Sequence, residues 1–277
     1  MSDLNVVGSN EFVITKEYRQ FVEFCEACIR YRYIGLCYGP PGVGKTLSAK
    51  HYSRWELIEI AHEQLRQEKP LEPEVLQCHT VFYTASVANN PSGIEREVRK
   101  LRNELNYTVD DAKHYLNGEK DKYWLYKDND IDTTTQLIIV DEADRLKMAG
   151  LEQIRDIYDQ SALGLVLVGM PGIEKRLSRY PQLYSRVGFV HQFRPLSNEE
   201  LRFILEKKWQ QMGLSFNPND FTDAEAISAI VRISSGNFRL LQRLFTQIER
   251  ILQINQLNIV TKEVVETARE SLVIGLV

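Results

Sequence analysis

The residues with the clearest chemistry lie in one short glycine-rich stretch. In order, they are Gly39, Pro40, Pro41, Gly42, Val43, Gly44, Lys45 and Thr46. The stretch fits the phosphate-binding pattern G-x-x-x-x-G-K-[ST] at every fixed position. Its glycines allow a tight turn, so that successive backbone N–H groups point at the phosphates of a nucleoside triphosphate. Lys45 would neutralise the β and γ oxygens, and the Thr46 hydroxyl would bind Mg²⁺. The stretch therefore predicts a binding site for ATP and Mg²⁺.

Two acidic residues follow an apolar run later in the chain. Residues 137–140 are Leu, Ile, Ile and Val, and Asp141 and Glu142 come next. Such a run indicates a central parallel strand, whose carboxyl end delivers polar side chains to an active site. Asp141 would hold Mg²⁺, directly or through water, and Glu142 would polarise the water that attacks the γ-phosphate. Alone, the run could be a plain strand end, but the complete phosphate loop upstream favours the catalytic interpretation.

Strands and helices must alternate around these side chains to position them. Residues 34–38 predict a buried strand directly before the glycine-rich loop, and residues 46–67 can continue as one helix that stops before Pro70. Residues 80–85 and 164–169 predict further strands, and residues 16–33, 94–105 and 173–180 predict helices. The order predicts an α/β fold with a parallel-sheet core. Residues 68–78 and 114–135 are polar, and we interpret the second segment as an insertion.

After Pro195 the pattern becomes entirely helical. Residues 197–200 and 222–225 each match a capping box, and residues 237–256 and 261–272 predict two more helices. We therefore place a nucleotide-binding domain in residues 1–195 and a helical domain in residues 196–277. In the insertion at 114–135, Tyr123, Trp124 and Tyr126 alternate with lysines, which suits contact with a nucleic acid or a partner as well as anchoring of the loop to its own domain.

In this order, the motifs resemble those of AAA+ ATPases. Residues 39–46 resemble the Walker A motif of that family, and residues 137–142 resemble its Walker B motif. Residues 164–169 resemble the next core strand, residues 182–186 the segment that presents an arginine finger, and residues 235–239 the sensor-2 motif of the lid domain. The resemblance covers residues 12–250. It implies an ATPase with a P-loop α/β core followed by a small all-helical lid.

The resemblance also implies roles for two arginines. Arg186 would act as the finger in the neighbouring subunit's site, since a guanidinium matches the charge that spreads over the γ-phosphate oxygens in the transition state. Arg239 would reach the nucleotide of its own subunit and couple the lid to ATP. Arg176 and Arg179 are competitors for the finger, with a solvated surface as the alternative. Arg243, one turn after Arg239, is the alternative to Arg239.

One departure from the family concerns the end of the fourth core strand. Many AAA+ proteins place a polar sensor-1 residue there, whereas this chain has Gly169 and Met170. A thioether is too weak a hydrogen-bonding group to orient a water molecule. We therefore expect hydrolysis that is slow or that uses another polar group.

Within the family, residues 141–147 and 167–172 look most like the TnsC, TniB and MuB group of regulators of DNA transposition. This resemblance implies that the chain binds double-stranded DNA and assembles with copies of itself in a ring or a helical filament. It also implies a transposase as a protein partner, with a targeting protein as a further candidate. Arg96, Arg99 and Lys100 share one face of the predicted helix 94–105 and are the candidate DNA contacts. A solvated surface with internal ion pairs is the alternative.

Composition leaves two other function classes open. The chain has 277 residues, 26% of them charged, and its net charge of −4 gives no overall attraction to nucleic acid. A nucleotide-switched ATPase that binds a protein and never meets DNA is therefore one alternative. A structural polymer in which ATP serves as assembly glue is the other. The sequence shows neither an apolar run of transmembrane length nor a secretory signal, so we expect a cytoplasmic protein without a membrane partner.

Overall fold

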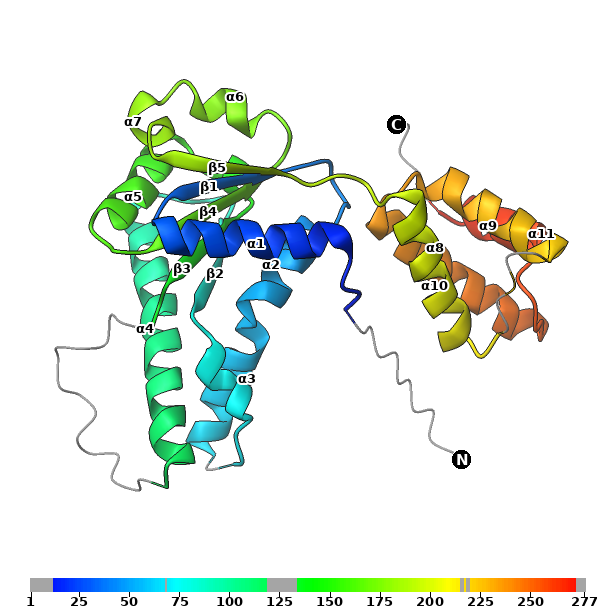
Figure 1. Cartoon of the computed structure of the whole chain (residues 1–277), viewed down its shortest axis with the longest axis horizontal. Helices are drawn as coiled ribbons and strands as arrows, with labels where there is room; N and C mark the ends of the chain where they lie inside the picture. Colours follow the sequence, from blue (N-terminus) through cyan, green and yellow to red (C-terminus); the bar gives the residue numbers. More distant parts are fainter. Residues whose placement is uncertain (1–11, 68, 119–133, 215–216, 218–219, 273–277) are drawn as a thin grey trace.

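A parallel β-sheet with helices packed around it forms the larger part of the computed structural model, and a group of helices lies beside it (Figure 1). The structure describes residues 12–67, 69–118, 134–214, 217 and 220–272. The strands are β1 (Ile34–Tyr38), β2 (Thr80–Thr84), β3 (Leu137–Asp141), β4 (Gly164–Gly169) and β5 (Val187–Gln192). They form one sheet in the order β2-β3-β4-β1-β5, in which every pairing is parallel. The predicted α/β class is confirmed.

Helices cover both faces of this sheet. They are α1 (Lys16–Tyr31), α2 (Lys45–Ser53), α3 (Trp55–Arg66), α4 (Pro91–Leu116), α5 (Met148–Asp159), α6 (Ile173–Leu177) and α7 (Pro181–Tyr184). Gly164 faces α1 so closely that a Cβ there would lie 2.8 Å from the carbonyl oxygen of Cys28. The next residue, Leu165, packs near side chains of α4 and α5. Because successive strand residues point to opposite faces, α1 lies on one face and α4 and α5 on the other.

The strand order decides where a site can form. β4 lies between β1 and β3, and the three strands run in the same direction. The loops that follow them therefore meet at one edge of the sheet, at its carboxyl end. The glycine-rich stretch follows β1, Asp141 ends β3, and Met170 follows β4. Three separate segments of the sequence are thus brought together by the topology.

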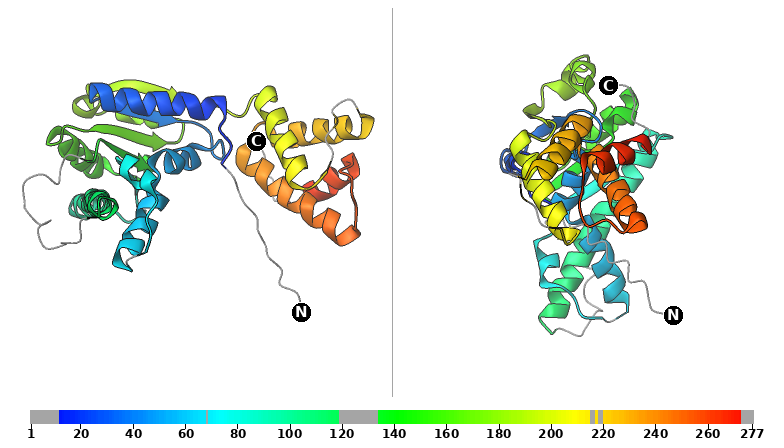
Figure 2. Two further views of the ribbon diagram at one scale, coloured as in Figure 1. Left: turned by 60° about the horizontal axis from the view of Figure 1, so that its bottom comes forward. Right: turned by 90° about the vertical axis from the view of Figure 1, so that its right-hand side faces the viewer.

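A second hydrophobic core lies in the group of helices beside the sheet. These are α8 (Asn198–Gln211), α9 (Phe221–Ser234), α10 (Phe238–Asn255) and α11 (Lys262–Glu270). Their apolar side chains, among them Trp209 and Phe245, form a cluster distinct from the one around the sheet. Residues 194–197 connect the two parts, which stand side by side in Figures 1 and 2. The predicted capping box at Ser197 and Glu200 starts α8, as expected.

Several predicted helix boundaries are wrong. The helix predicted over 46–67 is two helices, because Arg54 adopts a left-handed conformation with φ 50° between α2 and α3. The helix predicted over 94–105 is longer, since α4 begins at Pro91 and continues to Leu116. The predicted insertion at 114–135 therefore starts too early. Its aromatic residues Tyr123, Trp124 and Tyr126 lie outside the described residues.

Three further features differ from the prediction. The helix predicted over 173–180 ends at Leu177, and the short α7 follows it. The second capping box does not form, because the Asp220 carboxylate caps α9 two residues earlier by accepting from the N–H groups of Thr222 and Asp223. The edge strand β5 was not predicted. A 3₁₀ helix, η1 (Pro73–Gln77), also forms within the polar connector 68–78. No helix in the described part of the chain is long and apolar enough to cross a bilayer.

Candidate active site

The glycine-rich loop joins β1 to α2. Gly42 and Gly44 have φ angles of 81° and 105°, a region that residues with a Cβ avoid. Lys45 is the first residue of α2, so the loop leads into a helix N-terminus with its unpaired N–H groups. The Lys45 ammonium donates to the carbonyl oxygens of Gly39, at 2.6 Å, and Pro40, at 2.8 Å. This loop has the backbone geometry that a phosphate site needs.

A cavity opens over this loop at the carboxyl edge of the sheet, and we call it the phosphate cavity. Its lining comes from the loop, from the ends of β3 and β4, and from the start of α10. The residues are Pro41, Gly42, Gly44, Lys45, Thr46, Leu47, Lys50, Asp141, Glu142, Asp144, Gly169, Met170, Phe238, Arg239 and Gln242. The two acidic residues predicted from the sequence thus lie in one cavity with Lys45 and Thr46.

Burial makes the charges in this cavity interact strongly. Burial lowers the pKa of Lys45, and nearby acids, including Asp141 and Asp144, act in the opposite direction. Asp141 is only 3% exposed, and its burial raises the pKa of the carboxyl. A hydrogen bond from the Thr46 hydroxyl opposes that shift. A hydroxyl and a carboxylate in contact form the hard oxygen set that Mg²⁺ prefers, so these two side chains fit that metal.

Glu142 adopts a left-handed backbone conformation with φ 54°, which is uncommon for a residue with a side chain. This conformation falls directly after the buried strand β3, and Glu142 is among the residues that line the cavity. One carboxylate oxygen lies 3.6 Å from Nη2 of Arg145, and both side chains are about 40% exposed. Arg145 also donates to the carbonyl oxygen of Ala85, at 3.1 Å. The base predicted for hydrolysis is therefore partly open to solvent, with a neighbouring arginine close to it.

Asp144 is a residue of the cavity that the sequence interpretation missed. Its Oδ2 accepts a hydrogen bond of 2.7 Å from the backbone N–H of Met170. Gly169 makes room for it, because a Cβ there would lie 2.7 Å from the same oxygen. The Met170 sulfur lies 3.9 Å from Nζ of Lys45. A carboxylate thus stands beside the position of the missing sensor-1 group, and the third acid in the run 141–144 was the available signal.

Residues at the start of α10 reach the loop from the helical part. The Asn237 side chain donates to the carbonyl oxygen of Pro41 at 3.0 Å, and the backbone N–H of Arg239 donates to that of Gly42 at 3.0 Å. Arg239 is among the residues that line the phosphate cavity, and its contact with a nucleotide stays a prediction. Arg243 is exposed and is not among the lining residues. The helical part therefore contacts the phosphate loop directly.

We predict that Gly42→Ala weakens both folding and nucleotide binding. The left-handed φ costs alanine about 1–2 kcal/mol, and the new Cβ would lie 2.3 Å from Oδ1 of Asn237. A loss of that size lowers the melting temperature of a chain of this length by about 2–8 °C. Gly172→Ala is the matched control, because its φ is 102° and nothing lies within 4 Å of the added Cβ. Equal effects of both variants on ATP affinity would contradict a role for the Asn237 contact.

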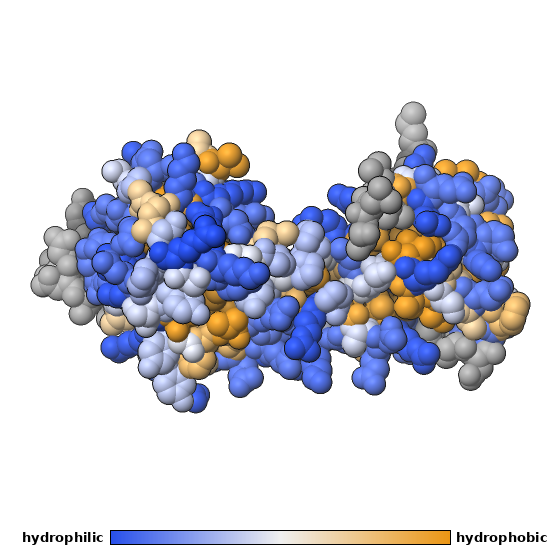
Figure 3. Space-filling view, turned by 90° about the horizontal axis from the view of Figure 1, so that it is seen from above, coloured by the Kyte–Doolittle hydropathy of each residue, from blue (hydrophilic) through white to orange (hydrophobic). Residues whose placement is uncertain are grey.

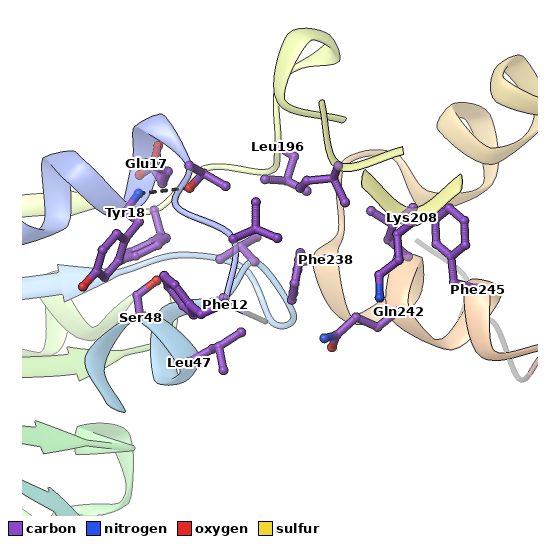
Figure 4. A pocket seen from close by; sticks show the side chains of 17 residues that line it. Phe12, Glu17, Tyr18, Leu47, Ser48, Leu196, Lys208, Phe238, Gln242 and Phe245 are labelled. Atoms are coloured by element: carbon purple, nitrogen blue, oxygen red, sulfur yellow. Dashed lines mark hydrogen bonds between the residues drawn. The ribbon is translucent and has the colours of Figure 1, made fainter. Parts of the chain in front are cut away.

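A second, mainly apolar cavity continues from the phosphate cavity between the two parts of the chain. Figure 4 shows Phe12, Leu47 and Ser48 on one side of it and Leu196, Phe238 and Gln242 on the other. Gly44, Leu47, Phe238 and Gln242 line both cavities. An apolar cleft beside a phosphate site suits the flat face of a nucleobase. Seen from above, the surface of the molecule is mostly hydrophilic, with apolar patches on both parts (Figure 3).

The predicted finger lies far from this site within the same chain. The carbonyl oxygen of Arg186 accepts from the N–H of Ile34, the first residue of β1, at 3.1 Å. Arg186 is thus at the amino edge of the sheet, and the loop lies at the other end of β1, about 16 Å away at 3.3 Å per residue. Among its competitors, Arg176 binds the backbone carbonyls of Asp144 and Leu146, and Arg179 is exposed.

The predicted DNA contacts Arg96, Arg99 and Lys100 are all exposed on α4. Arg99 forms an ion pair with Glu95 at 2.6 Å, so part of this face matches the solvated alternative. Lys100 lines a cleft that also holds Lys50 and Arg54, together with three glutamates, Glu56, Glu59 and Glu97. Basic and acidic side chains are thus balanced in this cleft, and a DNA contact by α4 stays a prediction.

Comparisons with known proteins agree with this geometry. A family model described as an AAA domain matches residues 29–177. A potential ATP-binding protein of Staphylococcus aureus is 47% identical over 282 residues, which cover 97% of this chain and 98% of that protein. The Mu-like prophage FluMu DNA transposition protein B of Haemophilus influenzae is 23% identical over 248 residues, covering 86% of this chain and 73% of that protein.

Solved structures show the same fold. The RuvB Holliday junction branch migration motor of Thermotoga maritima superposes with a TM-score of 0.56 at 17% identity, covering 94% of this chain and 70% of that one. The ORC2 protein of Aeropyrum pernix in its ADP form gives a TM-score of 0.58 at 13% identity, covering 97% and 71%. At such identities the likeness concerns the fold alone.

Proposed function

This chain belongs to the AAA+ ATPases and is related to the Mu-type transposition protein B, and from that premise we propose that it is an ATP-dependent regulator of DNA transposition. In this proposal it binds ATP with Mg²⁺, assembles with copies of itself, engages double-stranded DNA, and hydrolyses ATP to disassemble. A transposase, and a targeting protein as a further candidate, are its protein partners.

The phosphate cavity is the observation that carries the ATPase part of this proposal. Lys45 and the loop N–H groups would bind the β- and γ-phosphates, and Thr46 and Asp141 would hold Mg²⁺. Mg²⁺ held by these two side chains would supply positive charge to offset that of the phosphate oxygens. Glu142 would accept a proton from the attacking water, while Arg239 would contact the nucleotide from the helical part. The apolar cavity of Figure 4 would take the base.

The position of Arg186 supports the assembly part of the proposal. This arginine lies at the amino edge of the sheet, whereas the phosphate cavity lies at the carboxyl edge. It cannot reach the nucleotide of its own chain, so a finger role requires a neighbouring subunit. Contact between opposite edges of two copies is heterologous, and such contacts build closed rings or open helical filaments.

The transposition part of the proposal is supported by the similarity to the Haemophilus protein, which extends over 86% of this chain. We expect the protein to bind double-stranded DNA in the presence of ATP. The affinity should fall steeply as the salt concentration rises, because phosphate contacts release counterions. Changing Arg96, Arg99 and Lys100 together to alanine should make the slope of log affinity against log salt concentration shallower, by up to about three. Fluorescence polarisation of labelled DNA measures both effects.

A matched triple variant separates a local contact from a general loss of charge. Arg202, Arg250 and Arg269 are exposed arginines on the helical part, so changing them to alanine removes the same charge elsewhere. An equal loss of DNA affinity in both triple variants would place the contact away from α4. If ATP binds well and DNA does not bind at low salt, the protein-directed switch replaces the DNA regulator as the function.

A further inference from the structure

Arg186 is held in a fixed geometry by two partners. Its Nε donates to Oδ1 of Asp159 at 2.5 Å, and its Nη2 donates to Oδ2 of the same carboxylate at 2.8 Å. Its Nη1 donates to the carbonyl oxygen of Gln182. The carboxylate therefore forms a bidentate contact with the Nε side of the guanidinium, which fixes the plane of the guanidinium as well as its position.

The same contacts leave part of the guanidinium free for another ligand. A guanidinium has five N–H donors, of which Asp159 and Gln182 take three. One N–H remains on each terminal nitrogen, and the Arg186 side chain is 33% exposed. Two such N–H groups can donate side by side to two oxygens of a phosphate. Asp159 therefore orients the arginine without occupying the end that a phosphate would need.

We propose that Asp159 is a positioning residue for Arg186, so that a finger enters the neighbouring subunit's site already oriented. This role rests on the proposed function of Arg186 as a finger in trans. Orientation matters because a flexible arginine can adopt many rotamers and would lose that conformational entropy on reaching the transition state. An arginine fixed before assembly has less freedom to lose.

Asp159 also binds a second arginine, and the end of α5 that carries it is tied to another segment. Arg155, one turn earlier on α5, donates to its Oδ2 at 2.9 Å and to Glu152 at 2.8 Å. The adjacent Tyr158 hydroxyl donates to the carbonyl oxygen of Arg32, which ties the end of α5 to the segment before β1. Asp159 is the last residue of α5, where the helix dipole disfavours an anion. The ion pair with Arg155 offsets this cost within the helix, and Arg186 is a second cation that faces the same carboxylate.

The pair contributes little to folding, because both side chains are close to 30% exposed and partly solvated ion pairs are weak. Asp159→Ala should therefore fold normally and bind ATP normally, while its turnover falls on the order of tenfold at saturating ATP. Arg186→Ala should lose on the order of a thousandfold, since it removes the finger itself. Asp159→Glu, which keeps the charge at a different reach, should recover part of the rate.

Mixed assemblies provide the decisive readout. Glu142→Gln subunits have an inactive site but an intact Arg186, so they can serve the intact site of an Asp159→Ala neighbour. When the two variants are mixed 1:1 and assemble at random through heterologous contacts, about a quarter of the sites should contain Glu142 and face an Arg186 that Asp159 still orients. The mixture should thus turn over ATP faster than either variant alone. Asp156→Ala is the matched control, because Asp156 lies on the same helix and binds Gln160 instead.

The outcomes separate two failures. If Arg186→Ala hydrolyses ATP at the wild-type rate, the finger in trans is wrong, and the role of Asp159 falls with it. If Arg186→Ala is slow but Asp159→Ala matches Asp156→Ala, the finger stands and the positioning role is overturned. If Asp159→Ala is slow and mixing with Glu142→Gln restores nothing, Asp159 acts within its own subunit, which also overturns the proposal.

Discussion

Lys45→Ala is expected to bind ATP at least about a hundredfold more weakly than the unchanged protein, because removing one partner of a buried charge-assisted contact costs about 3 kcal/mol or more. Lys45 opens α2 and lines the phosphate cavity, and its ammonium already lies within hydrogen-bonding distance of the loop carbonyls of Gly39 and Pro40. ATP would replace these neutral acceptors by phosphate oxygens. The change in acceptor explains why binding should lose more than folding.

Isothermal titration with ATP measures this loss, and the melting temperature without nucleotide checks the fold. Lys45→Arg is the conservative control, because it keeps the charge while changing the shape of the donor. It should bind better than the alanine variant if charge dominates. Wild-type affinity in Lys45→Ala would show that the nucleotide does not lie in the phosphate cavity.

Local sequence patterns were sufficient for the strands that build the site. The runs that form β1 and β4 have the observed bounds, because a buried parallel strand is apolar throughout and ends where glycine or polar residues begin. The glycine loop is equally local, since its φ angles depend on the residues that adopt them. The predicted parts of the site are those in which consecutive residues act together.

The unpredicted features depend on contacts between distant segments. β5 is an edge strand whose residues alternate between partial burial and exposure, and it includes Gly188, where a Cβ would lie 2.5 Å from the Tyr33 ring. A strand without fully buried residues and with an internal glycine gives only a weak strand signal in the sequence. The break at Arg54 likewise has no glycine or proline to announce it. These elements are decided by tertiary packing, which overrides local propensity.

The same reason explains the missed residues of the site. Asp144 becomes part of the cavity because its carboxylate meets the N–H of Met170, which is 26 residues away. Asn237 meets Pro41 across 196 residues, and Arg186 meets Asp159 across 27. Motifs show which residues have the chemistry for phosphate and water. The partners that orient them become visible only when the chain is folded.

Glu142→Gln is expected to lower ATP turnover by about a hundredfold to ten-thousandfold, which is the range that a positioned general base contributes. The amide is nearly isosteric with the carboxylate, so it should leave the left-handed turn at residue 142 and the walls of the cavity in place. ATP affinity should therefore survive. Because hydrolysis is proposed to disassemble the oligomer, the variant should remain assembled after ATP is added, whereas the unchanged protein disassembles with time.

Phosphate release and light scattering on the same sample follow turnover and assembly together. Arg145→Ala is an informative companion, because it removes the cation 3.6 Å from Glu142 without changing the base. It should retain turnover, and a loss as large as that of Glu142→Gln would show that the arginine takes part in the step. Normal hydrolysis by Glu142→Gln would exclude Glu142 as the base. The carboxylate of Asp144, which lines the same cavity, would then be the first candidate, and Asp144→Asn the variant that tests it.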